Sequence, residues 1–241
     1  QRVSVASDGT EANGGSEFAR LSGNGQFVLF QSMARNLGGL DENKTWDVFL
    51  HERATGQTKC LSLAPSGRTG HAESTTGVLT PEGRFVVFES YASDLAANDD
   101  NADKDLFLYD RSNQTLELIT RAPDGHSGDG ASSGPSITDD GRYILFSSSA
   151  ENLAPPPAGG SSGIHLYDRV TRAITRLKPT APGLPSDVTF SAVNISPDGR
   201  WISLNSASLG AVAGDASHFT QAFLYERLTS ALIPVSVTRA G

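Results

Sequence analysis

The sequence predicts an all-β fold, a β-propeller of four blades, and three observations lead to this prediction. The 241 residues contain one unit repeated four times, with a period of 58 residues and without an insertion or deletion. Each copy holds short runs of apolar, aromatic and β-branched residues, which are typical of β-strands. No stretch combines sustained i, i+3, i+4 apolar spacing with helix caps, so helices are expected to be scarce. Equivalent antiparallel sheets that repeat by rotation form a propeller.

The period is set by residues that recur at the same place in every copy. The stretch "SPDGR" at 196–200 corresponds to "TDDGR", "TPEGR" and "SGNGQ" in the preceding copies. The recurring residues are Gly25, Gly83, Gly141 and Gly199; Ser32, Ser90, Ser148 and Ser206; Leu50, Leu108, Leu166 and Leu224; and Arg53, Arg111, Arg169 and Arg227. A residue found in all four copies is expected to serve the architecture, whereas one found in a single copy is free to be specific.

Each copy is predicted to form four strands of one antiparallel blade. The first leads into the glycine turn ("EFARLS", "FSAVNIS"), and the second leaves it as "FVLF", "FVVF", "YILF" or "WISL". Consecutive apolar residues indicate that the second strand is covered on both faces. The third strand reads "DVFLHER", "DLFLYDR", "IHLYDR" or "AFLYER", and the fourth alternates with period two, so one of its faces is wet. The expected blades, all in one domain of residues 1–241, are 17–64, 75–122, 133–180 and 191–238.

The turns predict which end of each blade is variable. Between the first and second strands, an Asp-Gly, Asn-Gly or Glu-Gly pair supplies the residue that takes positive φ in a tight hairpin. The turn between the third and fourth strands is also short. Both tight turns therefore lie at one end of the sheet, and the long connections gather at the opposite end.

The repeated motif resembles a known propeller family. "LSGNGQFVLFQS", "LTPEGRFVVFES", "ITDDGRYILFSS" and "ISPDGRWISLNS", each followed by a third strand like "YDR", are similar to the TolB-type, WD-repeat-like propeller repeat of many bacterial envelope and secreted proteins. The resemblance covers every copy, with departures at Asn24 and Gln26. It implies a propeller used mainly for binding, sometimes joined to a hydrolase, and a periplasmic or secreted location.

The pattern of the fourth strand occurs once more than those of the other three strands. Its pattern returns five times, and residues 2–7 form the extra copy at the N-terminus, expected as a surplus outer strand. One hypothesis is a closed four-bladed ring in which one terminal strand is displaced. The other is a stretch of a larger ring, or a homo-oligomer whose protomers complete each other, because an unpaired edge strand tends to find a partner.

Composition excludes several classes of protein. A net charge of −8 and a pI near 5.1 argue against a nucleic-acid partner, which would require Lys and Arg to neutralise phosphates. No apolar run approaches the roughly 18 to 20 residues of a membrane helix. Cys60 is the single cysteine and is expected to be a buried thiol. The chain starts at Gln1 rather than Met, which suggests that an upstream segment was removed and leaves a signal peptide open.

Two acidic loops suggest a cation site. Aligned by the repeat, "GLDENKTWD" and "ANDDNADKD" share an Asp-x-Asn-x-x-x-Asp pattern. Oxygen ligands at alternate positions of a short loop suit a hard cation, so calcium is the one cofactor that the sequence suggests, although the pattern is not an EF-hand. The alternative is that Asp and Asn simply form solvated turns. The candidate ligands are Asp41, Asn43 and Asp47 in the first copy and Asp99, Asn101 and Asp105 in the second.

Residues that are not repeated at the long-loop end are candidate ligand contacts. Only Trp46 of the two tryptophans lies in a loop, because Trp201 takes the core position of Phe27, Phe85 and Tyr143. The other candidates are His71 with Glu73, and His126 with Asp124 and Asp129, where the alternative is an ordinary polar rim. "GASSG" at 130–134 matches a hydrolase motif but lies between β-strands, so no catalytic residue is expected.

The function that these observations favour is a binding propeller that recognises a protein, peptide or carbohydrate through its long-loop face. The alternative is an enzyme, either a glycan-acting hydrolase or the gating propeller of a larger hydrolase. Fold alone does not choose between them.

Overall fold

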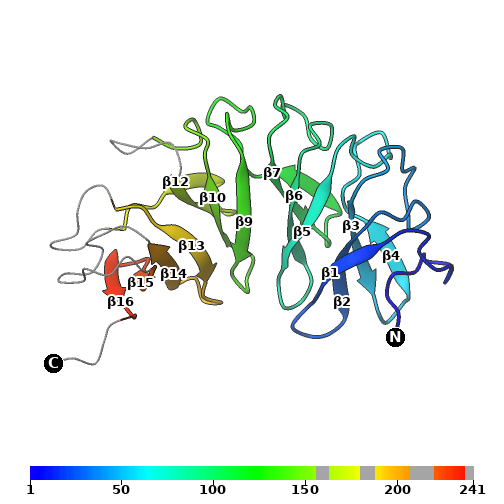
Figure 1. Ribbon diagram of the computed structural model, residues 1–241, viewed down its shortest axis with the longest axis horizontal. Helices are drawn as coiled ribbons and strands as arrows, with labels where there is room; N and C mark the ends of the chain where they lie inside the picture. The colour runs from blue at the N-terminus through cyan, green and yellow to red at the C-terminus, as the bar shows by residue number, and fades with distance from the viewer. Residues whose placement is uncertain (156–162, 180–187, 207–219, 237–241) are drawn as a thin grey trace.

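The computed structural model describes residues 1–155, 163–179, 188–206 and 220–236, which form an all-β propeller of four antiparallel blades (Figure 1). In this described part there is no helix that is long and apolar enough to cross a membrane. Each blade is a four-stranded sheet in sequential strand order. The strands are β1 (Ser16–Leu21), β2 (Phe27–Ser32), β3 (Asp47–Glu52), β4 (Gln57–Cys60), β5 (Ser74–Leu79), β6 (Phe85–Ser90), β7 (Asp105–Asp110), β8 (Thr115–Leu118), β9 (Ser132–Ile137), β10 (Tyr143–Ser148), β11 (Gly163–Asp168), β12 (Ala173–Arg176), β13 (Ser191–Ile195), β14 (Trp201–Ser206), β15 (Gln221–Glu226) and β16 (Ala231–Pro234).

The first tight turn of each blade has the positive-φ glycine that the sequence predicts, and the second turn is short, as expected, and also contains a residue with positive φ. In the first hairpin the repeated glycine has positive φ, from 62° at Gly83 to 70° at Gly199. The hydroxyl at the start of this turn accepts the N–H of the first residue of the second strand, as Thr80 does for Phe85 at 3.1 Å. In the second hairpin, positive φ recurs at Gly56, Gln114, Arg172 and Ser230.

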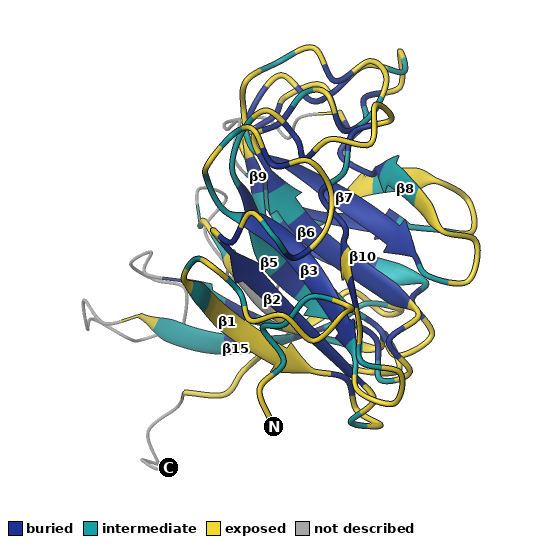
Figure 2. Cartoon of the chain, turned by 90° about the vertical axis from the view of Figure 1, so that its right-hand side faces the viewer, coloured by how far each residue is buried: buried dark blue, intermediate teal, exposed yellow. Residues whose placement is uncertain are grey.

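The second and third strands form the core, as their apolar runs predict. Every residue of β2 is buried, and Figure 2 shows β2, β3, β6 and β7 as dark bands inside the molecule. Three apolar clusters join consecutive blades, the first to the second, the second to the third and the third to the fourth. The blades are therefore held together by burial of apolar side chains between sheets.

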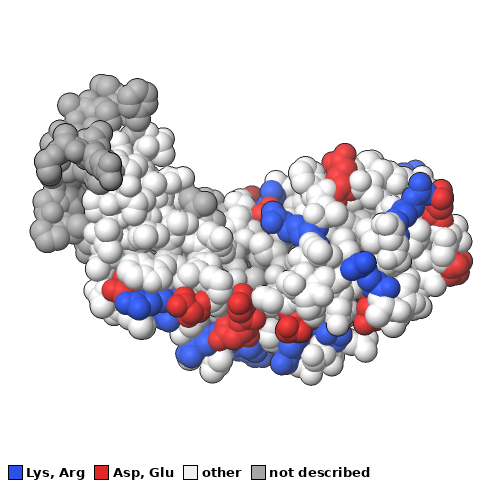
Figure 3. All heavy atoms as spheres, turned by 90° about the horizontal axis from the view of Figure 1, so that it is seen from below, with Lys and Arg blue, Asp and Glu red and all other residues white. Residues whose placement is uncertain are grey.

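An interlock at the tight-turn end repeats between neighbouring blades. The ring of Phe85 in the second blade packs where a Cβ at Gly141 of the third blade would lie. Arg169 covers the same ring at 4.2 Å and donates to the Gly141 carbonyl at 2.9 Å. The acid before this arginine, Asp168, pairs instead with Arg142 at 3.0 Å. Seen from this side, acidic and basic side chains alternate over the surface (Figure 3).

Residues 2–7, expected as an extra outer strand, lie beside β4 but do not form a regular strand. Val5 makes an isolated bridge to Glu11, in a small hairpin that matches the connections after β4 and β8, and its carbonyl accepts the hydroxyl of Thr58 in β4 at 2.5 Å. Ala6 donates its N–H to Thr10 at 2.8 Å, just as Ala122 donates to His126. This pattern of alternating residues belongs to the connection between blades, because the fourth strands end earlier than the sequence suggests.

The four blades form an open arc. The first and fourth blades lie at its opposite ends (Figure 1), and among the described residues no apolar cluster joins them. The outward face of the first blade is covered by Ala6 and Ala12 of the N-terminal hairpin, packed on a cluster around Phe30 and Phe49. The closed four-bladed ring is therefore not the arrangement of this chain.

Candidate functional site

The long connections gather at one end of the arc, and all of the predicted site residues lie in them or at their borders. Trp46 is half-buried, and its carbonyl accepts the N–H of Ser74 at 2.8 Å. Glu73, also half-buried, precedes Ser74, and its carbonyl accepts the N–H of Tyr91 at 2.9 Å. The structure thus brings Trp46 and Glu73 together at the start of β5.

Two exposed histidines each contact an aspartate of the β6–β7 loop. Nδ1 of His71 lies 3.0 Å from Asp94, and Nδ1 of His126 contacts Asp100. The histidines come from the connections on either side of this loop. The β6–β7 loop of the second blade thus lies between two imidazole side chains, each in contact with one of its aspartates.

Two of the predicted ligand residues, Asp124 and Asp129, accept hydrogen bonds from backbone N–H groups. Asp124 accepts the N–H of His126 at 3.0 Å, in the turn of the β8–β9 connection. Asp129 accepts the N–H of Glu151 at 2.7 Å, and its own N–H donates to Asn152. An equivalent contact recurs 58 residues earlier between His71 and Asp94. Asp124 thus stabilises its own turn, whereas Asp129 joins the β8–β9 connection to the β10–β11 connection.

The two acidic loops place buried carboxylates side by side. Asp47 and Asp105 are the first residues of β3 and β7, and they are 2% and 0% exposed. Each accepts a hydroxyl from the following connection, from Ser62 at 2.8 Å and from Thr120 at 2.6 Å.

The asparagine in each loop reaches across to the neighbouring connection. The Asn43 amide donates to the Gly70 carbonyl at 2.5 Å, and that of Asn101 donates to the Gly128 carbonyl at 2.6 Å. Each loop is therefore tied to the adjacent blade at the point where its acids meet.

Burial changes the protonation of these acids. It raises the pKa of Asp47 to about 7 and that of Asp105 to about 7, because a charged carboxylate is poorly solvated there. The pKa of Asp99 rises to about 6 for the same reason. The neighbouring carboxylates add to these shifts, since Asp41 acts on Asp47 and Asp99 acts on Asp105. The two acids of each loop therefore lie within electrostatic reach of each other.

In the third blade the position of the buried aspartate is occupied by glycine, and an arginine side chain of the same blade lies against it. Position 163, equivalent to Asp47 and Asp105, is glycine. The guanidinium of Arg176 from β12 fills the space that a Cβ at Gly163 would need. This arginine is 9% exposed.

The other side chains that could act in catalysis are buried within the blades. Ser132 of the "GASSG" stretch is buried in β9 and hydrogen-bonded to Ser148 at 2.9 Å. His51 and His165 are fully buried in third strands, and burial raises the pKa of the Cys60 thiol to about 12. Within the described ranges no three His, Cys, Asp or Glu side chains converge as metal ligands.

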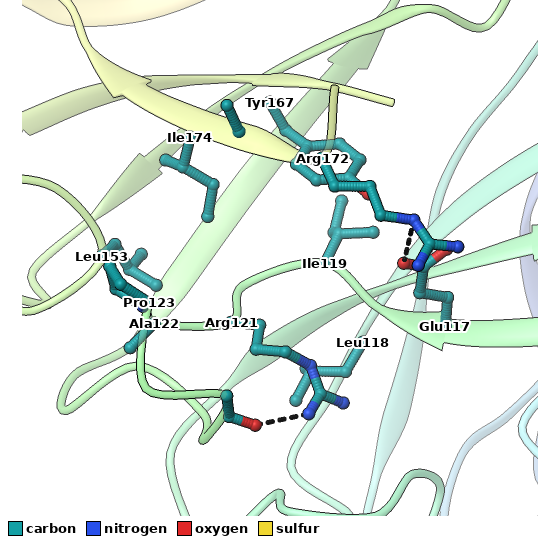
Figure 4. A pocket seen from close by; sticks show the side chains of 12 residues that line it. Glu117, Leu118, Ile119, Arg121, Ala122, Pro123, Leu153, Tyr167, Arg172 and Ile174 are labelled. Carbon is teal, nitrogen blue, oxygen red and sulfur yellow. Dashed lines mark hydrogen bonds and ion pairs between the residues drawn. The ribbon is translucent and has the colours of Figure 1, made fainter. Parts of the chain in front are cut away.

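A groove lies between the second and third blades (Figure 4). It has a volume of about 680 Å³ and borders the β8–β9 connection at Arg121 and Pro123. Arg121 donates to the Ala97 carbonyl at 3.1 Å, which links the groove to the acidic loop of the second blade. On the other side Arg172 lies 3.7 Å from Glu117. The apolar residues at its base are Leu118, Ile119, Leu153, Tyr167 and Ile174.

Sequence reasoning missed the groove and the role of Arg176. The residues lining the groove are distributed over β8, β11, β12, two long connections and the β11–β12 turn, and they meet only because two blades pack together. One signal for Arg176 was present in the sequence. A charged residue stands where the other copies have Cys60, Leu118 and Pro234, and in the same copy glycine replaces the acid.

Comparison with known proteins supports the fold. No family model and no curated protein sequence matches the chain. Among solved structures it is similar to a TolB from Agrobacterium tumefaciens (14% identity, TM-score 0.52, covering 95% of this chain and 64% of that one). It is also similar to the β-propeller domain of the Trilobed protease from Pyrococcus furiosus, described as having an open velcro topology (11%, 0.54, 92% and 57%). A third similar structure comes from a study of two prolyl endopeptidases (14%, 0.55, 92% and 29%). The chain spans less than two thirds of each of these structures.

Proposed function

We propose that this chain is a non-catalytic binding propeller that recognises a polypeptide in the groove between the second and third blades, which extends from the long connection at Pro123 to the tight turn at Arg172. The supporting observation is the groove itself, which has an apolar base and a border of charged side chains. Ligand sites in proteins are usually such concave, mostly apolar surfaces with a few polar groups that orient the ligand.

The lining favours a polypeptide over a carbohydrate. Aliphatic side chains dominate the base of the groove, and its one aromatic residue, Tyr167, is 3% exposed. The ring of a sugar needs an accessible aromatic face, which this groove lacks. Apolar peptide side chains would instead contact the half-buried Ile174 and the exposed Ala173 and Pro123, because the other aliphatic residues of the base are only 1% to 2% exposed. Arg172 and Glu117 could pair with charged groups on either side of a bound peptide. His126 follows Gly125 of the groove lining and would extend the contact surface.

The test is a peptide selected for binding to the wild-type chain from a random displayed library, with its affinity measured by calorimetry. Pro123 is exposed and lines the groove, so Pro123→Arg places a long charged side chain there. We expect this variant to weaken binding at least about tenfold, which corresponds to about 1.4 kcal/mol.

The chain offers a matched control for this variant. Pro65 holds the equivalent, exposed position in the preceding connection, so Pro65→Arg makes the same change outside this groove. Equal binding by wild type and Pro123→Arg would contradict the groove as the site. Selection of carbohydrate ligands instead of peptides would contradict the ligand class.

A second candidate is the gating propeller of a longer hydrolase. The observation in its favour is that the chain covers only 29% of the prolyl endopeptidase structure and 33% of an acylaminoacyl peptidase. Cleavage of the selected peptides by the protein isolated from its natural source, but not by this chain, would support it. Cleavage by this chain itself would contradict a non-catalytic role. In either role we propose a periplasmic or secreted location.

A further inference from the structure

The β6–β7 loop contains two buried carboxylates with unused oxygens. Asp99 is 9% exposed and Asp105 is 0% exposed, yet Oδ1 of Asp99 and Oδ2 of Asp105 have no hydrogen-bond partner. In the part of the chain that the structure describes, neither carboxylate forms an ion pair with Lys or Arg. A buried, unpaired carboxylate oxygen is costly, and two in one loop are more so.

The first blade repeats this arrangement. Asp41 is 9% exposed, and its Oδ2 also has no hydrogen-bond partner. Here Arg35 supplies part of the missing positive charge, with its Nε 3.7 Å from Asp41 Oδ2. The second loop has no such arginine, because position 93 is serine. The first loop thus has one buried carboxylate oxygen without a hydrogen-bond partner and the second has two, so the first two copies share a related arrangement.

The third blade indicates that a positive charge fits at the position of these buried acids. Where the first two blades carry Asp47 and Asp105, the third carries Gly163, and the guanidinium of Arg176 lies against it. A positive charge supplied by the chain thus occupies this place when the acid is absent. In the first two blades the acids are present, and a positive charge from outside the chain would balance them.

We propose that each of the two acidic loops binds one calcium ion, through Asp99, Asn101 and Asp105 in the second blade and through Asp41, Asn43 and Asp47 in the first. The donor atoms are carboxylate oxygens and the asparagine amide oxygens, which suit a hard cation rather than one that prefers nitrogen or sulfur. Each amide oxygen also accepts a main-chain N–H, from Asp103 at 2.7 Å and from Thr45 at 2.8 Å. Calcium fits better than magnesium because it accepts irregular geometry and main-chain carbonyl or water ligands in the remaining positions. With two carboxylates per loop, the expected dissociation constant is on the order of 10⁻⁴ M.

The ions would also act on the neighbouring connections. Asn101 binds the carbonyl of Gly128, and Asn43 binds that of Gly70. A cation that holds these asparagines therefore stiffens the β8–β9 and β4–β5 connections, which carry His126 and His71. Binding is expected to raise thermal stability and to order the long-loop end.

The experiment is calorimetry and thermal unfolding of the chelator-treated chain, with calcium chloride and magnesium chloride as the two probes. We expect two calcium ions per chain, a higher unfolding midpoint with calcium, and a weaker effect of magnesium. Asp105→Asn should lose one of the two binding events. Without calcium it should unfold at a higher temperature than wild type, since it removes a buried charge and keeps the acceptor for Thr120.

The control is Asp139→Asn, which removes an exposed carboxylate at the tight-turn end and should bind calcium as wild type does. If Asp105→Asn fails to fold, Asp99→Asn in the same loop serves instead. No heat and no shift of the midpoint at about 10 mM calcium would overturn the proposal. Two unchanged binding events in Asp105→Asn would also overturn it.

Discussion

Single side chains set the charge balance inside each blade. Asp47, Asp105 and Arg176 reach the same buried place in three successive blades, although they come from different strands. A sheet interior tolerates a charge only where another charge or several dipoles oppose it. Replacement of an acid by glycine in the third blade therefore goes together with a nearby arginine, and the proposed calcium ions would balance the acids of the first two blades.

His165 gives a test of buried charge at the residue scale. It stacks on Phe146 at 5.5 Å between ring centroids, and burial lowers its pKa from 6.5 to about 4. The folded protein thus resists protonation of His165, whereas the unfolded chain takes up the proton below pH 6.5. The free energy of unfolding is therefore unaffected by His165 above pH 6.5. It decreases by up to about 3 kcal/mol as the pH falls from 6.5 towards 4.

The other blades carry Phe49, Phe107 and Phe223 at this position. We expect His165→Phe to remove this part of the loss in free energy of unfolding between pH 6.5 and 4, measured by urea denaturation. Phe107→His should introduce a similar loss in the second blade. Parallel pH curves for wild type and His165→Phe would contradict the argument.

At the scale of the element, the first hairpin of the second, third and fourth blades is also a contact with the preceding blade. The glycine in this turn takes positive φ, leaves room for the aromatic ring of the preceding blade, and accepts a hydrogen bond from an arginine that covers that ring. One residue type thus meets a backbone requirement and a packing requirement together. This explains why the Gly and Arg positions recur in all four copies.

A comparison of Gly141 with Gly56 distinguishes the backbone requirement from the packing requirement. Gly141 has φ 67° and the Phe85 ring against it, whereas Gly56 has φ 73° and no atom within 4 Å of the place where a Cβ would lie. Gly56→Ala should cost only the left-handed backbone, about 1 to 2 kcal/mol. Gly141→Ala should cost about 1 to 3 kcal/mol more, because Phe85 must move. Chemical denaturation measures both, and equal losses would show that the ring contact contributes nothing.

At the scale of the whole molecule, the arc leaves the inner edge of its first blade open. β1 is exposed over most of its length, whereas β5 and β9 are half covered by neighbouring blades. Phe18 and Leu21 of β1 are 68% and 59% exposed. An exposed apolar edge strand is a site of association, and we expect a second copy of this chain to cover it.

This expectation is tested by sedimentation velocity over a range of concentrations. Phe18→Asp places a charge on the open edge, and Asp tolerates the positive φ of 52° at this position. We expect wild type to self-associate and Phe18→Asp to shift towards monomer. Leu228→Asp removes an equally exposed apolar side chain from a tight turn and should leave association unchanged. A wild-type monomer at all concentrations would contradict the expectation.

Much of the blade could be predicted from the chain alone. Strand type, the antiparallel order and the two tight turns depend on neighbours in sequence, through apolar runs and glycines with positive φ. The acidic loops were visible as a pattern, because their members lie within a few residues of each other. Whether their carboxylates were buried or solvated was not visible, since the covering groups Ser62 and Thr120 belong to the next connection.

The sequence by itself determined the repeated unit, its four strands and the end at which the variable loops gather. Only the tertiary structure decided that the blades form an open arc, that residues 2–7 belong to a connecting hairpin, and that a groove separates the second and third blades. The physical reason is that periodicity records which face of a strand is buried but not the angle at which sheets pack. Small differences in that angle, summed over four blades, decide whether a ring closes.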